Sequence, residues 1–305
     1  MVKYLHMEKV KVAIIGAGEL GLALAKIIGP KAEILFWDKE ADKLTDLPGA
    51  DMPLPEIVSQ SKIIFLAIPS WGLKEALFCL SPYFSAQQII ITLSKGLEDS
   101  TYKTAPEFVA KIASKCLVGH LSGPMIAEEL SAGHPGWAVL ASSSKKVLAV
   151  TELFADSKLA VTISSDVIGV ALAGVLKNIY ALGAGIGEAL GWDDNSRAFY
   201  LQQAISEILK IGVLLGGKKE TFLGIPGVAD FLATALSRSS LNNELGRLIA
   251  RGDDLDKKSE GSVSLPLIIH LLGKKASDFP LLAMLKKVVL EKQLAEEVFK
   301  QEKYL

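Results

Sequence analysis

A glycine-rich turn near the start of the chain constrains the fold more than any other feature. Gly16, Gly18 and Gly21 have the spacing GxGxxG, after the apolar run 12–15 and at the start of a helical pattern. Gly16 allows a tight turn, Gly18 lets the backbone approach a pyrophosphate, and Gly21 lets helix and strand pack closely. The helix N-terminus adds free N–H groups. The turn therefore predicts a dinucleotide site; the alternative is a glycine-rich turn that binds nothing.

Short β-rich runs alternate with helical patterns through the first half of the chain. Several runs are continuously apolar, as in strands that are covered on both faces of a parallel sheet. This alternation predicts an α/β fold, with a doubly wound, mainly parallel sheet of the Rossmann type. The predicted strands are 10–15, 33–37, 62–68, 88–93, 116–121, 137–141 and 159–163.

The pattern becomes helical after residue 164. We therefore predict an N-terminal Rossmann domain over 1–164 and an all-helical substrate and catalytic domain over 165–305. The predicted helices are 166–189, 196–215, 227–237, 241–251 and 281–303, with a polar connection at 253–262.

Composition narrows the class of protein. The net charge is −1, so we expect no nucleic-acid partner. The most apolar stretch, 167–192, contains Lys177, Asn178 and Glu188, which favours a helix buried between two domains over membrane insertion. We expect no signal peptide, because residues 1–11 mix charged with apolar residues and no small-residue cleavage site follows. The two cysteines indicate a reducing compartment, so we expect a cytoplasmic protein. The histidines lack metal-ligand spacing and are interpreted as surface or packed residues: His6, His120, His134 and His270.

Asp38 lies twenty residues after Gly18, at the end of the second predicted strand. A carboxylate there accepts hydrogen bonds from the adenosine ribose hydroxyls and repels a ribose phosphate. We therefore predict NAD as the preferred cofactor and keep NADP as the second choice. The alternative for Asp38 is a solvated residue beside Lys39.

Three further segments carry polar residues suited to chemistry. The segments 94–98 and 121–124 each follow a strand, at the sheet edge where open α/β folds bind ligands. The third segment, 174–178, places Lys177 in the apolar helix. A lysine among apolar neighbours must find a partner or lose its proton more easily. The alternative is a lysine whose ammonium reaches the surface.

These segments together resemble the NAD(P)-dependent glycerol-3-phosphate dehydrogenase family over nearly the whole chain. The order and spacing of the matches carry the resemblance. They are 15–18, 68–70, 94–98, 121–124 with Ala127 and Glu128, 168–170, 176–178, Asn195, Glu207, 227–230, Thr234, Asn242 and 260–261.

The resemblance implies reversible hydride transfer between NAD(P)H and dihydroxyacetone phosphate, a three-carbon phosphate, without a metal. It implies that Lys177 is the general acid/base, with Lys95 as a second cation and Asp230, Thr234 and Asn178 as orienting groups. It implies cofactor contacts at Gly16, Gly18, Glu19, Leu20, Gly21, Asp38, Pro69, Lys95, Ala127 and Glu260. It implies substrate contacts at Lys95, Gly123, Met125, Ser240, Leu241 and Asn242.

The chain resembles a divergent member, because four positions depart from the family pattern. Leu241 stands where the family has the arginine that grips the substrate phosphate. Gln203 replaces an arginine, Met125 a threonine or serine, and Leu20 an aromatic residue. Arg238, three residues before Leu241, either compensates or is a surface charge.

Three functions follow from this pattern. The first is a glycerol-3-phosphate dehydrogenase with a displaced phosphate grip, and the second is a paralogue that reduces another carbonyl, phosphorylated or not. The third is a nucleotide-binding protein without turnover, which would not need Lys95, Lys177 and Asp230. The apolar helical half is compatible with a homodimer.

Overall fold

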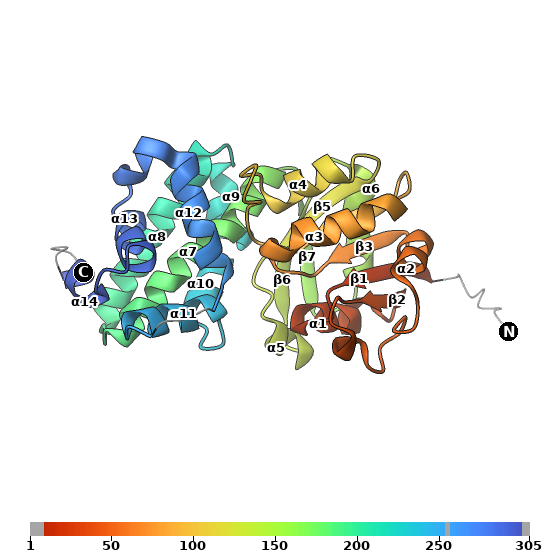
Figure 1. Ribbon diagram of the computed structural model, residues 1–305, viewed down its shortest axis with the longest axis horizontal. Coiled ribbons are helices and arrows are strands. Elements are labelled where there is room, and N and C mark those ends of the chain that lie inside the picture. The colour runs from red at the N-terminus through yellow and green to blue at the C-terminus, as the bar shows by residue number, and fades with distance from the viewer. Residues whose placement is uncertain (1–8, 254–256, 301–305) are drawn as a thin grey trace.

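The computed structural model of the chain describes residues 9–253 and 257–300. Three groups of residues from the predictions above lie outside this part. They are His6 with the rest of 1–8, residues 254–256 of the predicted polar connection, and residues 301–305, which include the end of the predicted helix 281–303. The described chain forms two lobes, one built on a sheet and one of helices (Figure 1).

The first lobe is built on a seven-stranded sheet with the order β2-β1-β3-β4-β5-β6-β7. Neighbouring strands are parallel except β5 and β6, which are antiparallel. This confirms the predicted mainly parallel Rossmann sheet. The strands are β1 (Val10–Ile15), β2 (Ala32–Trp37), β3 (Ile63–Leu66), β4 (Ile89–Thr92), β5 (Leu117–Ser122), β6 (Gly136–Ala141) and β7 (Leu159–Ser164).

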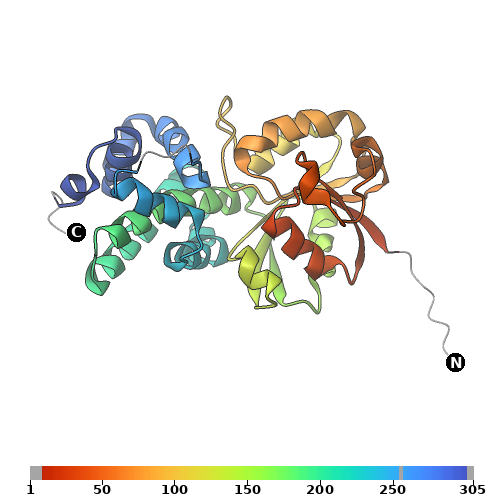
Figure 2. The same ribbon diagram turned by 60° about the horizontal axis from the view of Figure 1, so that its bottom comes forward.

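Helices cover both faces of this sheet, which explains the continuously apolar strands. Successive side chains of β1 enter opposite layers: Val12 and Ile14 pack with α1, whereas Ala13 and Ile15 pack with α2, α3 and α4. The two views agree on this layering (Figures 1 and 2). The helices are α1 (Glu19–Ile28), α2 (Leu54–Gln60), α3 (Ser70–Leu80), α4 (Ala105–Ile112), α5 (Ala127–Ser131) and α6 (Lys145–Leu148), with 3-10 turns η1 (Ala41–Leu44), η2 (Ser81–Tyr83) and η3 (Ala149–Phe154).

The second lobe is organised around α7 (Val167–Ala189). The Asp166 side chain accepts the Gly169 N–H and so caps the start of this helix. By length and composition α7 could cross a membrane, but 83% of its most apolar window is buried against other helices. The remaining elements are α8 (Asp194–Leu214), α9 (Lys219–Leu223), the π-turn η4 (Ile225–Ala229), α10 (Asp230–Leu236), α11 (Leu241–Ala250), α12 (Glu260–Leu272), η5 (Gly273–Asp278), α13 (Pro280–Leu285), the π-turn η6 (Lys286–Leu290) and α14 (Ala295–Lys300).

Two predictions about the C-terminal helices are wrong. The predicted single helix 281–303 is instead α13, η6 and α14, because the chain bends at 291–294, where Lys292 takes a φ of 57°. Helix α12 was not predicted. Ser259 caps its start in a capping box with Ser262, but Pro266 inside the helix interrupts the sequence pattern.

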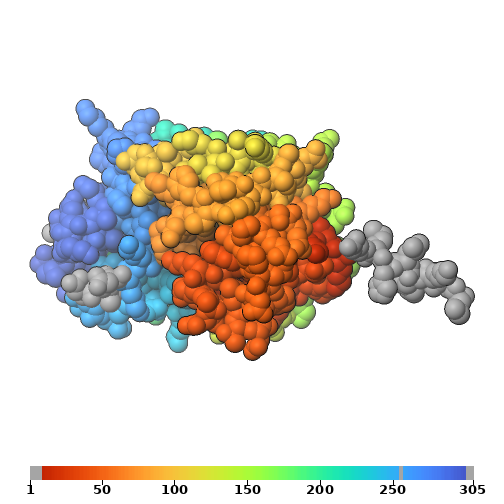
Figure 3. Space-filling model, turned by 45° about the vertical axis from the view of Figure 1, so that its right-hand side comes forward, coloured from red at the N-terminus to blue at the C-terminus, as the bar shows by residue number. Residues whose placement is uncertain are grey.

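The two lobes meet where the carboxyl ends of the strands face α7. In the space-filling view the orange segment near residues 50–80 forms the near face, and the blue C-terminal helices lie beside it (Figure 3). The polar segments at 94–98 and 121–124 extend from β4 and β5 toward this junction, where α7 packs against β5.

Candidate active site

The glycine loop between β1 and α1 has the geometry of a phosphate cradle. Gly16 has a φ of +107°, and a Cβ there would lie 2.5 Å from the Ala67 carbonyl oxygen. A Cβ on Gly21 would collide with the Gly16 carbonyl oxygen. No described atom lies within 4 Å of the Cβ position of Gly18, which precedes the first turn of α1. The loop therefore requires glycine for its own geometry at two positions and leaves the third open to a ligand.

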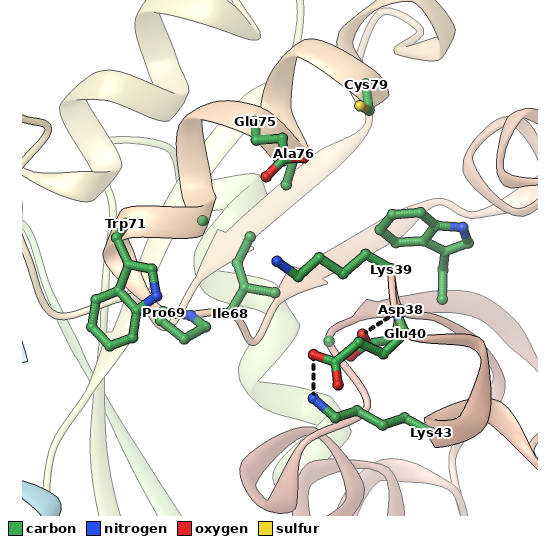
Figure 4. A pocket seen from close by; sticks show the side chains of 13 residues that line it. Asp38, Lys39, Glu40, Lys43, Ile68, Pro69, Trp71, Glu75, Ala76 and Cys79 are labelled. Carbon is green, nitrogen blue, oxygen red and sulfur yellow. Dashed lines mark hydrogen bonds and ion pairs between the residues drawn. The ribbon is translucent and has the colours of Figure 1, made fainter. Parts of the chain in front are cut away.

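Asp38 ties the end of β2 to this loop. Its Oδ2 accepts the Ala17 N–H at 2.8 Å and its Oδ1 accepts the Glu40 N–H at 2.9 Å. A cavity of about 240 Å³ adjoins the loop. Figure 4 shows Pro69 and Trp71 on one side of it and Asp38 and Lys39 on the other. The cavity is lined both by residues at and after the end of β2 and by residues of α3.

Glu260 reaches across from the helical lobe to the start of α3. Its carboxylate accepts the Ser70 N–H at 2.7 Å and the Ser70 O–H at 2.6 Å. Burial raises the pKa of Glu260, and the bonds from Ser70 oppose that shift. Glu260 thus fixes the turn after Pro69, which lies in the wall of the cavity.

Two ammonium groups share one buried carboxylate at the junction of the lobes. Lys177 Nζ donates to Asp230 Oδ1 at 2.8 Å, and Lys95 Nζ donates to Asp230 Oδ2 at 2.7 Å. Lys177 also donates to Thr234 Oγ1 at 2.6 Å, and Lys95 to the Gly123 carbonyl at 3.1 Å. Asp230 is only 2% exposed. We call Lys95, Lys177 and Asp230 the lysine pair and its carboxylate; their net charge is positive when both lysines are protonated.

The pKa of Lys177 is lowered to about 8. Burial is the main cause, because it penalises the charged form, and the neighbouring charge of Lys95 acts in the same direction. The Asp230 carboxylate opposes both effects. Lys177 can therefore hold or release a proton near neutral pH, as a general acid/base must.

Three elements from distant parts of the chain position these groups. Lys177 lies in the middle of α7, and Asp230 is the first residue of α10, directly after the π-turn η4. Thr234 lies one turn further along α10, so it shares a face with Asp230. Lys95 follows β4 at the sheet edge. The fold thus brings together the five predicted residues Lys95, Lys177, Asp230, Thr234 and Gly123.

Asn178 and Asn242 form a separate buried contact beside the lysine pair. Asn242 Nδ2 donates to Asn178 Oδ1 at 3.0 Å, and Asn242 Oδ1 accepts the Gly261 N–H at 2.8 Å. A Cβ on Gly261 would collide with the Asn178 carbonyl oxygen. These contacts join α7, α11 and α12. They therefore fix the position of Glu260 relative to Lys177.

Known proteins match this chain in both lobes. Family models described as the NAD-dependent glycerol-3-phosphate dehydrogenase N-terminus and C-terminus match residues 49–148 and 166–300. The glycerol-3-phosphate dehydrogenase (NAD(P)+) of Clostridium acetobutylicum is 33% identical over 92% of this chain and 92% of its own length. The chain belongs to this family. The enzyme of the same name from Fusobacterium nucleatum is 32% identical over 94% of this chain and 95% of its own length.

A solved glycerol-3-phosphate dehydrogenase from Coxiella burnetii has the same fold. It superposes with a TM-score of 0.88 at 25% identity, covering 96% of this chain and 98% of that one. The similarity therefore extends over both lobes and includes the junction between them.

Some residues predicted from the family pattern have side chains that pack in the first lobe, are exposed to solvent or cap a helix. The Met125 side chain packs in the core of the first lobe, and the partly buried Leu20 side chain packs against that core. Glu19 is exposed at the first turn of α1, so its carboxylate turns outward. Leu241 is 66% exposed at the start of α11, and Ser240 caps that helix through the Asn243 N–H.

The remaining predicted residues occupy peripheral positions. Ala127 is the first residue of α5, which packs beside α1. Gln203 bonds its neighbour Gln202, and Arg238 is an exposed residue of the loop between α10 and α11.

Two polar side chains near the site, Ser70 and His120, are not among the residues to which the sequence assigns a role in the site. Ser70 is the partner of Glu260, and its position after Pro69 at a helix start was the available signal. His120 is fully buried near the end of β5, directly before the predicted segment 121–124, and Ser122 within that segment is fully buried too. His120 was interpreted as a packed residue; it is packed, but it lies within electrostatic range of Lys95 and Asp230.

Proposed function

We propose that this chain catalyses reversible hydride transfer between NAD(P)H and dihydroxyacetone phosphate, giving sn-glycerol 3-phosphate. The observation that carries the proposal is the lysine pair on one buried carboxylate, at the strand edge that also presents the glycine loop. Membership of the glycerol-3-phosphate dehydrogenase family supports the choice of substrate.

Lys177 acts as the general acid in this proposal. Hydride arriving at a carbonyl carbon builds negative charge on the carbonyl oxygen, and the Lys177 ammonium stabilises that charge and donates its proton to it. Lys95 adds a second cation beside the same oxygen. Asp230 and Thr234 hold Lys177 in place through the two hydrogen bonds described above. In the reverse direction neutral Lys177 accepts the proton of the alcohol.

The cofactor site fits a dinucleotide. Gly16 and Gly18 present backbone at the N-terminus of α1, and Asp38 and Pro69 line the adjoining cavity. When bound, the nicotinamide supplies the hydride. Glu260 acts on this site through Ser70, which sets the turn after Pro69.

Nicotinamide fluorescence tests the proposal. We expect NADH to be consumed when dihydroxyacetone phosphate is added and to be consumed slowly with unphosphorylated dihydroxyacetone. Exposed Leu241, at a position where the resemblance implies an arginine, favours the second candidate function, a reductase of another carbonyl. Turnover with the unphosphorylated ketone alone would select that candidate, and binding of NADH without turnover on either would favour a non-catalytic protein.

The next prediction concerns the binding of the substrate phosphate near Leu241. Hydrogen bonds to charged groups contribute roughly 1.5–3 kcal/mol, so a missing arginine weakens substrate binding about tenfold to a hundredfold. We expect a raised KM for dihydroxyacetone phosphate and a KM about tenfold lower in Leu241→Arg. If Arg238 binds the substrate phosphate in place of the absent arginine, Arg238→Ala will raise the KM for dihydroxyacetone phosphate strongly, and Leu241→Arg will lower it little.

Leu241→Gln is the control for polarity, because it adds hydrogen-bonding groups at this position without a charge. If neither Leu241→Arg nor Arg238→Ala changes the KM for the phosphate ester, this loop does not hold the phosphate. The choice of substrate would then lose most of its support.

We propose that NADH is preferred to NADPH. Asp38 accepts two backbone N–H groups and lines the cavity, so a ribose phosphate would approach a fixed negative charge. Lys39 and Lys43 also line the cavity, but Lys43 is paired with Glu40 at 2.8 Å. We expect kcat/KM to be higher with NADH and the difference to shrink in Asp38→Asn. Equal or better efficiency with NADPH in the wild type would contradict this role of Asp38.

The pH dependence follows from the protonation of Lys177. Reduction needs the ammonium, so kcat/KM for dihydroxyacetone phosphate should fall as the pH rises through about 8, the pKa of Lys177. Oxidation of glycerol 3-phosphate needs the neutral amine and should rise over the same range. A reduction rate that is flat between about pH 7 and pH 9 would argue against Lys177 as the acid.

We also propose a domain boundary near residue 164, between the last strand of the sheet and α7, with lobes over 1–164 and 165–305.

A cytoplasmic location is consistent with the two free cysteines, of which Cys79 is exposed. A homodimer fits exposed apolar residues such as Trp137 and Ile163. Sedimentation of the purified protein tests that association.

A further inference from the structure

The loop between β4 and α4 extends from the first lobe onto the second. We call residues 96–104 the bridging loop; it begins one residue after Lys95. Leu97 of this loop is 4% exposed and belongs to the hydrophobic core of the helical lobe, together with Leu265 and Ile268 of α12. Figures 1 and 2 both show the loop before α4 between the lobes, beside α12. The bridging loop therefore ties the segment that carries Lys95 to the opposite lobe.

A stack of two rings makes a second contact between this loop and the helical lobe. The ring of Tyr102 and the imidazole of His270, which lies in the last turn of α12, have centroids 4.2 Å apart and planes only 10° from parallel. Tyr102 takes a φ of 56°, a backbone conformation that a tyrosine rarely adopts and that costs free energy. The strained residue of the loop is thus the residue that stacks on the other lobe.

Glu98 makes the bridging loop rigid. Its buried carboxylate accepts the N–H and O–H groups of both Ser100 and Thr101. Its backbone N–H donates to the Lys103 carbonyl at 2.8 Å, and its carbonyl accepts the Tyr102 N–H at 2.8 Å. These bonds couple the two ends of the loop, so a restraint on the Tyr102 ring also restrains the start of the loop.

Helix α12 contacts the first lobe at both of its ends. Glu260 at its start accepts two hydrogen bonds from Ser70, and His270 near its end stacks on Tyr102. A Cβ on Gly96 would collide with Ser70 Oγ and would lie 2.7 Å from Glu260 Oε2. The bridging loop therefore starts against one of these contacts and ends at the other.

We propose that the stack of Tyr102 on His270 is a latch between the lobes, and that both side chains are positioning residues for Lys95. The ion pair of Lys95 with Asp230 crosses the lobe junction, so it requires the first lobe to be held in one place on the second. The latch supplies this restraint through the loop that follows Lys95. A displacement of about 1 Å can lower a rate about a hundredfold, so a modest restraint has a measurable effect.

Proteolysis of the full-length protein tests the latch without turnover. Trypsin cleaves after Lys103 when the loop opens, because the Lys103 carbonyl is otherwise bonded to Glu98. In His270→Ala, which leaves the loop sequence intact, we expect this cleavage to be about fivefold faster than in the wild type. His270→Phe keeps a flat ring and should match the wild type. Cleavage after exposed Lys146 is the internal reference and should not change.

Two results of this experiment would overturn the latch. One is equal cleavage after Lys103 in His270→Ala and the wild type. The other is a parallel rise after Lys146, which would indicate general destabilisation of the first lobe. Tyr102 is half-buried and His270 is exposed, so we expect both alanine variants to fold.

Single-turnover kinetics test the positioning of Lys95, and this effect rests on the function proposed above. Tyr102→Ala and His270→Ala should each slow hydride transfer to dihydroxyacetone phosphate about fivefold, with the Kd for NADH within about twofold of the wild type. The double variant should be no slower than either single variant, because both remove the same contact. Tyr102→Phe keeps the stack and should react at the wild-type rate. Wild-type rates in both alanine variants, or losses that multiply in the double variant, would contradict the proposal.

A Lys95→Met background tests whether the latch acts through Lys95. In this background His270→Ala should change the rate of hydride transfer by less than about twofold, because the group that it positions is gone. The same fivefold loss there would overturn the role in positioning. An inactive wild type in which His270→Ala still opens the loop would overturn the proposed function and leave the latch standing. An active wild type whose loop and rate do not respond to His270→Ala would do the reverse.

Discussion

Lys177→Ala is expected to abolish reduction of dihydroxyacetone phosphate while the Kd for NADH stays within about twofold of the wild type. Lys177 belongs to α7, whereas the glycine loop and Asp38 belong to the first lobe. General acid/base groups contribute on the order of a hundredfold to ten-thousandfold in rate. Loss of the ammonium also removes the charge that stabilises the developing oxyanion, which adds to the effect.

Single-turnover kinetics with bound NADH make this measurement, because they report the hydride step without product release. Lys177→Arg is the matched control. It keeps the charge but holds its proton too firmly to act as an acid, so it should bind NADH normally and remain slow. Near-normal turnover in a folded Lys177→Ala protein would refute the role of Lys177.

Asp230→Asn is expected to have the second-largest effect, on both stability and activity. The Asp230 carboxylate is the shared counterion of Lys95 and Lys177, so the substitution leaves a buried and a partly buried ammonium group without the carboxylate that pairs with them. Breaking a buried ion pair by removing one partner typically costs about 3–5 kcal/mol. We expect a lower urea midpoint, and a rate of reduction at least about a hundredfold lower.

The pH dependence of Asp230→Asn distinguishes this explanation from a general loss of structure. Without the carboxylate, the pKa of Lys177 should fall further, since Asp230 is the main group that opposes the effect of burial. Reduction should therefore recover partly as the pH is lowered below neutrality. A variant as stable as the wild type would contradict the shared-counterion geometry, and a uniform loss of rate at every pH would indicate misplacement alone.

The sequence predicted the sheet because local and long-range signals agree there. The apolar runs of β1, β3 and β4 are buried on both faces, and the glycine spacing occurs at a turn where backbone approaches backbone. The C-terminal helices were predicted less well. A capped helix with an internal Pro266 and a chain that bends at Lys292 both break the helical period on which prediction depends.

The sequence identifies the site residues whose local setting along the chain marks them, but not the contacts that only the tertiary fold creates. Lys95 follows a strand and Lys177 lies in an apolar helix, so both could be singled out. That Asp230 bridges them is a tertiary fact, since the three residues are far apart in sequence. The same holds for the nearness of His120 to this site, because an alternating strand pattern does not say which face lies toward the helical lobe.

Isotope transfer tests the central claim most directly. The wild-type protein is incubated with dihydroxyacetone phosphate and NADH that carries deuterium at both C4 positions, and the phosphate ester is analysed by mass spectrometry. Direct hydride transfer predicts glycerol 3-phosphate with one deuterium, carried at C2, and a label that does not wash out in ordinary water. Lys177→Ala should give almost none of this product. Unlabelled glycerol 3-phosphate, or labelled product from dihydroxyacetone but none from its phosphate, would contradict the account.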